Sequence, residues 1–517
     1  MHHHSKNVLH AEPIHLLYDK RMLQHRPLDW KEPAVFPRYR DEAENDYPIE
    51  NPERIKVLYN RLCALNQRLV GCNGSLYRQL IARKATKEEV LLAHSESQYD
   101  RLHQLEFQTD DELREMSNDT QSDMYYCQES FYAARLAAGG LLECIDAICS
   151  SPSSSEHMGS TATGSHSHQF RFDAKPNKAL ALVRPPGHHA CQSKEMGFCF
   201  IDSVVIAAKY ALANKKAKKV LILDWDIHDG NATAEGTIEN ENIFRVDLHR
   251  YNPKHPFYPF TGSPRDVGNG KARGLNLNVA WSKGGMGNRE YGAAFYELIL
   301  PLITDYQPDL VIISCGLDAA MGDLLGDCCL TPGFFHAMTR AVIEAVGPDT
   351  PILSALEGGY TISVIPDCME GVTLAMLNLP YSYSSGTNSG FYQFTASGAA
   401  APSPDDPDQV WTPRNALARS RRVLSQYYVR LESVSLQLEK SAVRDINSSI
   451  RIFEAIRRWK HVPLKSIRVP NTSPQIIGQK HGRQKQPISD EWPIPYARPK
   501  IYMWYGTEAH HQKTSAV

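Results

Sequence analysis

The sequence lacks long apolar runs. No stretch of 18 apolar residues occurs, so we expect no transmembrane helix and no membrane partner. The first residues also lack the apolar core of a signal peptide, and His2, His3 and His4 resemble the remnant of a purification tag. The histidines at this end are therefore left out of any reasoning about metal sites.

The sequence also lacks paired cysteines and a dominant charge. Its 11 cysteines are scattered without a Cys-x-x-Cys pair, which argues against a zinc ribbon and a disulfide framework. This pattern predicts reduced thiols and an intracellular location, in the nucleus, the cytoplasm or both. The 56 basic side chains nearly balance the 58 acidic ones. Because no basic field would attract nucleic acid, we expect no direct binding to nucleic acid.

What the sequence does contain is a regular alternation of apolar runs and helical patterns from residue 178 onward. Such alternation predicts a single large α/β domain, a doubly wound parallel sheet with helices on both faces. The first 150 residues read as mostly helical. The predicted strands are 179–183, 220–223, 243–246, 275–279, 310–314 and 352–355, and the predicted helices among them are 200–214, 290–305, 333–346 and 363–378.

Changes in composition divide the chain into segments. A Ser-, Gly- and Thr-rich stretch interrupts the main domain and is predicted to be a disordered surface insertion. The expected organisation is a tag-like N-terminus over 1–9, a main domain over 10–380 with the insertion at 150–172, a linker or long loop over 381–411, helices that pack on the main domain over 412–462, and an extension over 463–517.

The most informative motif is Asp-Trp-Asp-Ile-His at 224–228, directly after a buried apolar run. In extended backbone, alternate residues point to one side, so Asp224, Asp226 and His228 converge at the end of a strand. Two carboxylates and an imidazole are metal-ligating groups. Four more fragments carry chemical groups at the ends of apolar runs, namely 184–190, 196–200, 314–320 and 356–360. Parallel sheets bind ligands at this edge, so the sequence predicts a metal-containing site there.

These five fragments, in this order, make the sequence resemble the zinc-dependent histone deacetylase family, in its class II branch. The resemblance covers roughly residues 10–380 and a returning helix near 447–460. It implies an arginase/deacetylase-like fold and hydrolysis of Nε-acetyl-lysine to lysine and acetate. The implied partners are acetylated proteins, either histone tails or non-histone proteins.

The resemblance also implies the metal sites. Asp226, His228 and Asp318 would hold one ion, and three protein ligands with open positions are typical of catalytic zinc. An oxygen-rich ligand set also accommodates iron(II). A structural potassium ion would be held by Asp224, Asp226, His228, Asp247 and Leu248.

Four groups carry the implied catalysis. His189 would act as general base and then as general acid for the leaving amine. His188, oriented by Asp224, would supply electrostatic support, and Asn231 falls where the partner of the other histidine is expected. Tyr360 would donate a hydrogen bond to the developing oxyanion.

The implied substrate tunnel suits the four methylenes of a lysine side chain. Gly197 would offer its carbonyl, and Asp123 would accept from the substrate backbone at the rim. Leu325 stands where polyamine deacetylases of the family carry a glutamate. The remaining residues are the aromatic walls Phe198 and Tyr258 and a structural or product-exit arginine, Arg54.

Three positions depart from the family pattern. Asp229 replaces a second histidine, Asp247 replaces a serine in the potassium set, and Tyr258 replaces a phenylalanine. No metal ligand is lost, so these departures bear on potassium dependence and substrate range rather than on the reaction. Two other functions stay open, an acetylpolyamine deacetylase on the same scaffold and a catalytically weak acetyl-lysine binder.

Overall fold

The computed structural model describes residues 11–31, 48–71, 74–118, 123–149, 176–383 and 440–459. The predicted tag-like N-terminus (1–9), the insertion (150–172) and the extension (463–517) lie outside these ranges. So do nearly all of the predicted linker and the first part of the predicted C-terminal helical region.

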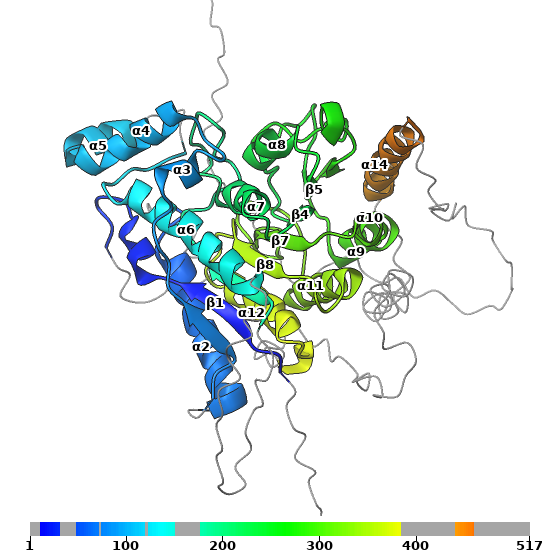
Figure 1. The fold of residues 1–517 in the computed structure, drawn as a ribbon, viewed down its shortest axis with the longest axis horizontal. Coiled ribbons are helices and arrows are strands. Elements are labelled where there is room, and N and C mark those ends of the chain that lie inside the picture. Colours follow the sequence, from blue (N-terminus) through cyan, green and yellow to red (C-terminus); the bar gives the residue numbers. More distant parts are fainter. Residues whose placement is uncertain are drawn as a thin grey trace, which may run out of the picture.

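The core is an eight-stranded sheet in the order β2-β1-β3-β8-β7-β4-β5-β6, surrounded by helices (Figure 1). Every strand pair is parallel. The predicted single parallel sheet with helices around it is thereby confirmed. The strands are β1 (Ile14–Tyr18), β2 (Tyr77–Leu80), β3 (Lys178–Leu182), β4 (Val220–Asp224), β5 (Ile243–Arg250), β6 (Asn276–Trp281), β7 (Leu310–Cys315) and β8 (Ile352–Leu356).

The central strands are buried along their whole length. All residues of β3, β4, β7 and β8 are inaccessible to solvent or nearly so. Strands covered on both faces need uninterrupted apolar sequence, which explains why the apolar runs were sufficient to predict them. The sequence prediction missed β1 and β2. Of these, β2 is an edge strand whose Arg78 and Gln79 are exposed, so it carries no apolar run.

The helices that cover the sheet also pack against one another. Helix α6 contacts α7 and strands β1, β3 and β8, whereas α11 packs against α10 and α12, and α12 packs against α2. The predicted helix over 290–305 is an unbroken run of α9, a π-helical turn at Phe295–Ile299, and α10. The bounds are α2 (Glu53–Val70), α3 (Lys87–Val90), α4 (Glu96–Gln104), α5 (Asp110–Ser117), α6 (Ser130–Cys149), α7 (Ser203–Ala213), α8 (Asn231–Thr237), α9 (Asn288–Ala294), α10 (Leu300–Tyr306), α11 (Pro332–Val346) and α12 (Ile365–Met376).

A last helix, α14 (Lys440–Trp459), returns to the domain and packs on β6 and α9 (Figure 1). Ala442, Ile446 and Ile450 are buried, at the four-residue spacing of one helix face. The carboxylate of Asp445 accepts from the backbone N–H and hydroxyl of Ser282, both at 2.9 Å. Among the described residues, no helix is long and apolar enough to cross a membrane.

Candidate active site

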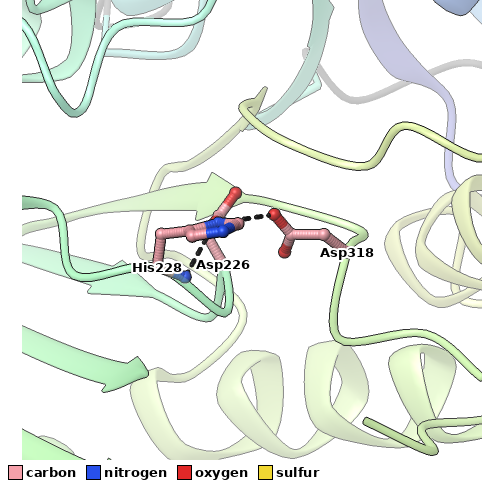
Figure 2. Close-up of side chains that lie close together, drawn as sticks. All are labelled: Asp226, His228 and Asp318. Carbon is pink, nitrogen blue, oxygen red and sulfur yellow. Dashed lines mark hydrogen bonds and ion pairs between the residues drawn. The ribbon is translucent and has the colours of Figure 1, made fainter. Parts of the chain in front are cut away.

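Three metal-ligating side chains meet beyond the carboxyl ends of β4 and β7. Asp226 and His228 lie on the loop after β4, and Asp318 lies on the loop after β7. Figure 2 shows the imidazole of His228 between the two carboxylates. The Nδ1 atom of His228 is 3.0 Å from Asp226 Oδ1 and 3.0 Å from Asp318 Oδ2. The structure thus brings together the three residues that the sequence reading assigned to one metal ion.

The residues present fit a divalent ion. Their ligand atoms are buried and lie within 4.8 Å of one another. A backbone amide holds one of these carboxylates in place, because the Gly358 N–H group donates to Asp226 Oδ2 at 2.8 Å. A Cβ atom at Gly358 would lie 2.4 Å from Asp226 Oδ2 and 2.5 Å from Asp318 Oδ2, so only glycine leaves this space open. Two carboxylates and one imidazole in a buried space are the donor set that zinc accepts.

Two adjacent histidines lie beside this set, each with a different partner. His188 Nδ1 is 3.1 Å from Asp224 Oδ2, and His189 Nδ1 is 2.8 Å from Asn231 Oδ1. Both histidines are buried, and burial alone lowers a histidine pKa. The carboxylates of Asp226 and Asp224 outweigh burial at His188 and raise its pKa well above the ordinary value. At His189, burial and the charges of neighbouring His188 and His228 hold the pKa well below it.

Glu357 supports the histidine pair, and the sequence reading missed it. Its Oε2 accepts from the backbone N–H groups of Gly187 at 2.8 Å and His188 at 3.2 Å. Burial raises the pKa of Glu357 to about 7. Its position next to Gly358 in the Leu-Glu-Gly-Gly-Tyr fragment, at the end of β8, was the available signal.

Tyr360 is held against the site by Arg54. The Arg54 side chain donates to the carbonyl of Gly359 at 2.7 Å and to that of Glu357 at 2.5 Å. The carbon atom of its guanidinium lies 4.6 Å from the centroid of the Tyr360 ring. Burial, and to a smaller degree the carboxylates of Asp226 and Asp318, raise the Tyr360 pKa well above its ordinary value. The hydroxyl therefore keeps its proton.

A second missed residue, Asp323, connects the loop that carries Tyr360 to the loop that carries Leu325. One carboxylate oxygen of Asp323 accepts from the N–H groups of Tyr360 at 2.9 Å and Thr361 at 3.3 Å. The other accepts from the N–H groups of Leu325 at 2.8 Å and Gly326 at 3.2 Å. Leu325 itself is half-buried.

The residues that the resemblance assigns to the substrate tunnel lie near His189 and Tyr360. The ring of Phe198 packs edge-on at 5.4 Å from that of Tyr360. Gly197 N–H donates to Asp123 Oδ1 at 3.0 Å, so this exposed carboxylate is tied to the backbone next to Phe198. Gly197 has a left-handed backbone, and a Cβ atom there would lie 2.4 Å from His189 Cδ2. Glycine is required for this approach to the ring.

Tyr258, which the resemblance also assigns to the tunnel, packs against His189. Its ring is nearly perpendicular to that of His189, with centroids 5.2 Å apart. The hydroxyl is buried, and no described residue makes a hydrogen bond of good geometry to it. Burial, and then the charge of Asp123, raise the Tyr258 pKa. The Tyr258 hydroxyl therefore keeps its proton and can donate a hydrogen bond to a ligand or to a residue at the rim of the site.

The residues of the expected potassium site do come together, but with an unexpected neighbour. Asp224 of β4 lies opposite Asp247 of β5 in the sheet, and Leu248 is buried next to it. Arg245, which the sequence reading did not consider, forms an ion pair with Asp247. Asp247, one of the residues expected to hold potassium, is thus already paired with a guanidinium.

The chain resembles known proteins over most of the described domain. Residues 48–376 match the family model described as histone deacetylase domain. Histone deacetylase 6 of Caenorhabditis elegans is 38% identical over 299 residues, which are 57% of this chain and 29% of that protein. Histone deacetylase clr3 of Schizosaccharomyces pombe is 34% identical over 370 residues, which are 71% of this chain and 48% of that protein. Polyamine deacetylase HDAC10 of Danio rerio is 31% identical over 375 residues, 72% of this chain and 48% of that protein.

The solved structures include the HD domain of HDA15, which is 28% identical with a TM-score of 0.58. The similarity covers 83% of this chain and 99% of that domain. The chain spans less than half the length of each of the three relatives described above. Because the matched family region takes up more than half of the sequence, the chain belongs to the histone deacetylase family.

Proposed function

We propose that this protein is a metal-dependent deacetylase that hydrolyses Nε-acetyl-lysine in proteins to lysine and acetate. One observation carries the proposal. A buried set of metal ligands lies beside two histidines whose pKa values move in opposite directions, upward at His188, where carboxylates outweigh burial, and downward at His189, where burial and neighbouring positive charge act together. Hydrolysis by acid–base catalysis needs an unprotonated group that can take a proton, here His189. A protonated neighbour, here His188, supplies electrostatic support.

Asp226, His228 and Asp318 would hold the ion. The histone deacetylase family is generally zinc-dependent, and zinc is the proposed ion, with iron(II) as the alternative. When bound, such an ion supplies Lewis-acid polarisation of the acetyl carbonyl and of water. Metal analysis of the purified protein by mass spectrometry distinguishes the two ions.

His189 is the proposed general base. The Asn231 side-chain oxygen accepts from Nδ1–H of His189, which leaves the Nε2 lone pair free to take a proton. The low pKa of His189 keeps that nitrogen unprotonated at neutral pH. After the attacking water loses its proton to Nε2, the same nitrogen returns it to the leaving amine.

His188 is the proposed electrostatic partner. Its contact with the Asp224 carboxylate favours the protonated ring. The ring centroids of His188 and His189 are 4.0 Å apart, so a positive charge on His188 opposes a second one on His189. Once His189 has taken its proton, this repulsion makes it a stronger acid and favours proton delivery to the amine.

Tyr360 is the proposed oxyanion donor. Its hydroxyl stays protonated and therefore can donate where negative charge develops on the acetyl oxygen. Arg54 and Asp323 hold this residue through its ring and backbone, so that little reorganisation is needed during the reaction.

Acetyl-lysine in a peptide is the proposed substrate rather than an acetylated polyamine. Leu325 offers no countercharge for a second amine, and burying an unpaired cation against leucine is unfavourable. The exposed Asp123 carboxylate, tied to the backbone next to Phe198, suits the N–H groups of a peptide backbone. Similarity to a polyamine deacetylase keeps the polyamine as the second candidate.

The scaffold alternative, an acetyl-lysine binder without turnover, is disfavoured by the complete ligand set and by Tyr360. Release of acetate from an acetyl-lysine peptide, measured with purified protein before and after chelation and zinc addition, tests the proposal. Metal-dependent release supports it. Peptide binding without release would indicate the binder.

We further propose that residues 10–380 form the catalytic domain and that the region 412–462 belongs to it through α14. An intracellular location is proposed on the basis of the cysteines, since those that the structure describes are free.

A further inference from the structure

Arg245 is a buried arginine in the middle of β5, and acceptors surround its guanidinium. One terminal nitrogen donates to Asn276 Oδ1 at 3.0 Å and Asn278 Oδ1 at 2.8 Å, both on β6. The other donates to Asp229 Oδ1 at 2.6 Å and to the carboxylate of Asp247. An arginine keeps its charge in any such environment, so this is a permanent cation inside the sheet.

This cation contacts Asp247, one of the residues that the resemblance assigns to a potassium ion. Asp247 pairs with Asp224 across the β4–β5 ladder. A Cβ atom at Gly230 would lie 2.8 Å from Asp224 Oδ2 and 3.4 Å from Asp247 Oδ2, so the two carboxylates border one small space. Asp224 is the partner of His188. The charge of Arg245 therefore lies beside Asp247 and close to Asp224, the carboxylate that contacts His188.

Both oxygen atoms of the Asp247 carboxylate already have partners, so its charge is not available to a monovalent ion. Its Oδ2 accepts from Arg245 and from Gly230 N–H at 3.1 Å, and its Oδ1 contacts His249 Nδ1. Asp229 is bound in the same way, by Arg245 and by a hydroxyl. The residues present thus do not fit a potassium site that uses Asp247 as its charged ligand.

A divalent ion fits no better. Ligand atoms of Asp229, Asp247 and His249 lie within 4.8 Å of one another, as metal ligands would. However, Arg245 already donates to both carboxylates. A divalent ion would place two further positive charges beside a buried guanidinium, and like charges in this setting repel strongly.

The cluster also anchors the loop that follows Tyr258. Thr261 Oγ1 donates to Asp229 Oδ2 at 2.6 Å, and His249 Nε2 is 2.8 Å from the carbonyl of Gly262. A Cβ atom at Gly262 would lie 2.2 Å from His249 Nε2, which shows how closely this loop covers the cluster. Arg245 thereby connects the carboxylates near His188 to the loop that follows Tyr258.

We propose that the guanidinium of Arg245 is a resident cation that takes the place of the potassium ion, and that Asp229 and Asp247 are its counterions. It is a positioning residue, which acts through Asp224 and through the Tyr258 loop. Two of the departures from the family pattern then have one explanation, because both replacements supply carboxylates to the same arginine. The active site is accordingly independent of potassium.

The first experiment compares thermal unfolding of the full chain in potassium chloride with that in tetramethylammonium chloride at equal ionic strength. We expect the same Tm in both salts. A potassium-specific rise on the order of 2–4 °C would indicate a bound ion and overturn the proposal. A crystal grown with rubidium gives an independent reading, in which an anomalous peak beside Asp247 would also overturn it. Neither measurement depends on deacetylase activity.

The second experiment uses two variants. Arg245→Met removes the charge and leaves two buried carboxylates, so potassium should now raise Tm on the order of 2–4 °C over tetramethylammonium. Arg245→Lys keeps a charge and should stay insensitive to potassium, although it loses the fork geometry. A folded Arg245→Met variant without a potassium response would contradict the proposal. If this variant does not fold, a potassium-specific rise in Tm in wild type or in Arg245→Lys overturns the proposal, and its absence in both supports it.

Discussion

Replacing Tyr360 by phenylalanine removes one hydroxyl and leaves the ring contacts in place. The ring stacks under the guanidinium of Arg54 at 4.6 Å and against Phe198 at 5.4 Å, and phenylalanine retains both contacts. Binding of the substrate should therefore change little. If the hydroxyl donates to the oxyanion only in the transition state, its loss should lower kcat about 10²–10³-fold, which corresponds to about 2.7–4 kcal/mol.

The assay measures kcat with an acetyl-lysine peptide and, separately, the Kd of the same peptide. Tyr77→Phe is the matched control, because it removes a buried hydroxyl without a hydrogen-bond partner among the described residues, on the outermost strand of the sheet. The control should keep its kcat. A Tyr360→Phe variant with normal kcat, or one in which only the Kd rises, would refute the assigned role.

Four further predictions concern metal, pH and substrate. Asp318→Ala should lower the metal content and abolish turnover, as measured by mass spectrometry and acetate release; full occupancy would argue against this ligand. Asn231→Asp places a carboxylate beside His189 and should raise its pKa, so that the acid limb of the kcat/KM profile moves to higher pH; an unmoved limb would exclude this base. Burial would raise the pKa of Glu50, but Arg184 and Arg54 outweigh burial and lower it from 4.5 to about 2, so its stabilisation should be complete above pH 4.5 and lost as the pH falls towards 2. Glu50→Gln should be less stable at neutral pH and lose less stability over that interval, and an unchanged acid transition would contradict this. Wild type should prefer acetyl-lysine peptides over acetylspermidine in kcat/KM, and Leu325→Glu should shift the ratio towards the polyamine; a wild-type preference for acetylspermidine would reverse the substrate assignment.

The strands were predictable from the sequence where both faces of the sheet are buried. Strands β4 and β7 are covered on both faces, so their apolar runs carry the whole signal. Strand β2 is polar and lies at the edge of the sheet, where pairing with β1 rather than composition makes it a strand. A short edge strand of this kind has no periodic signal in the sequence.

The residues of the candidate site were predictable because their chemistry gathers at the ends of strands. The supporting residues were not, because their partners lie far away in the sequence. Glu357 accepts from Gly187, 170 positions away, and Asp323 accepts from Tyr360, 37 positions away. Their partners are backbone N–H groups, which every residue carries, so no side-chain pattern indicates the contact.

Arg245 is another residue whose role was not predicted from the sequence. In the sequence it is a single arginine inside the predicted strand 243–246, and it was not considered as part of the site. Asp247 follows Arg245 by two residues on the same strand, so the two side chains share a face, but only the fold brings in Asp229 from the loop after β4. The two unusual carboxylates were recognised from the sequence, but the cation that explains them was not.

The most direct test of the account is acetate release from an acetyl-lysine peptide by protein whose metal content is known. The account predicts about one zinc ion per chain, loss of turnover on chelation, and recovery on addition of zinc. The Tyr360→Phe variant should bind the same amount of metal and turn over far more slowly. Protein that carries its ion, binds the peptide and releases no acetate would contradict the account.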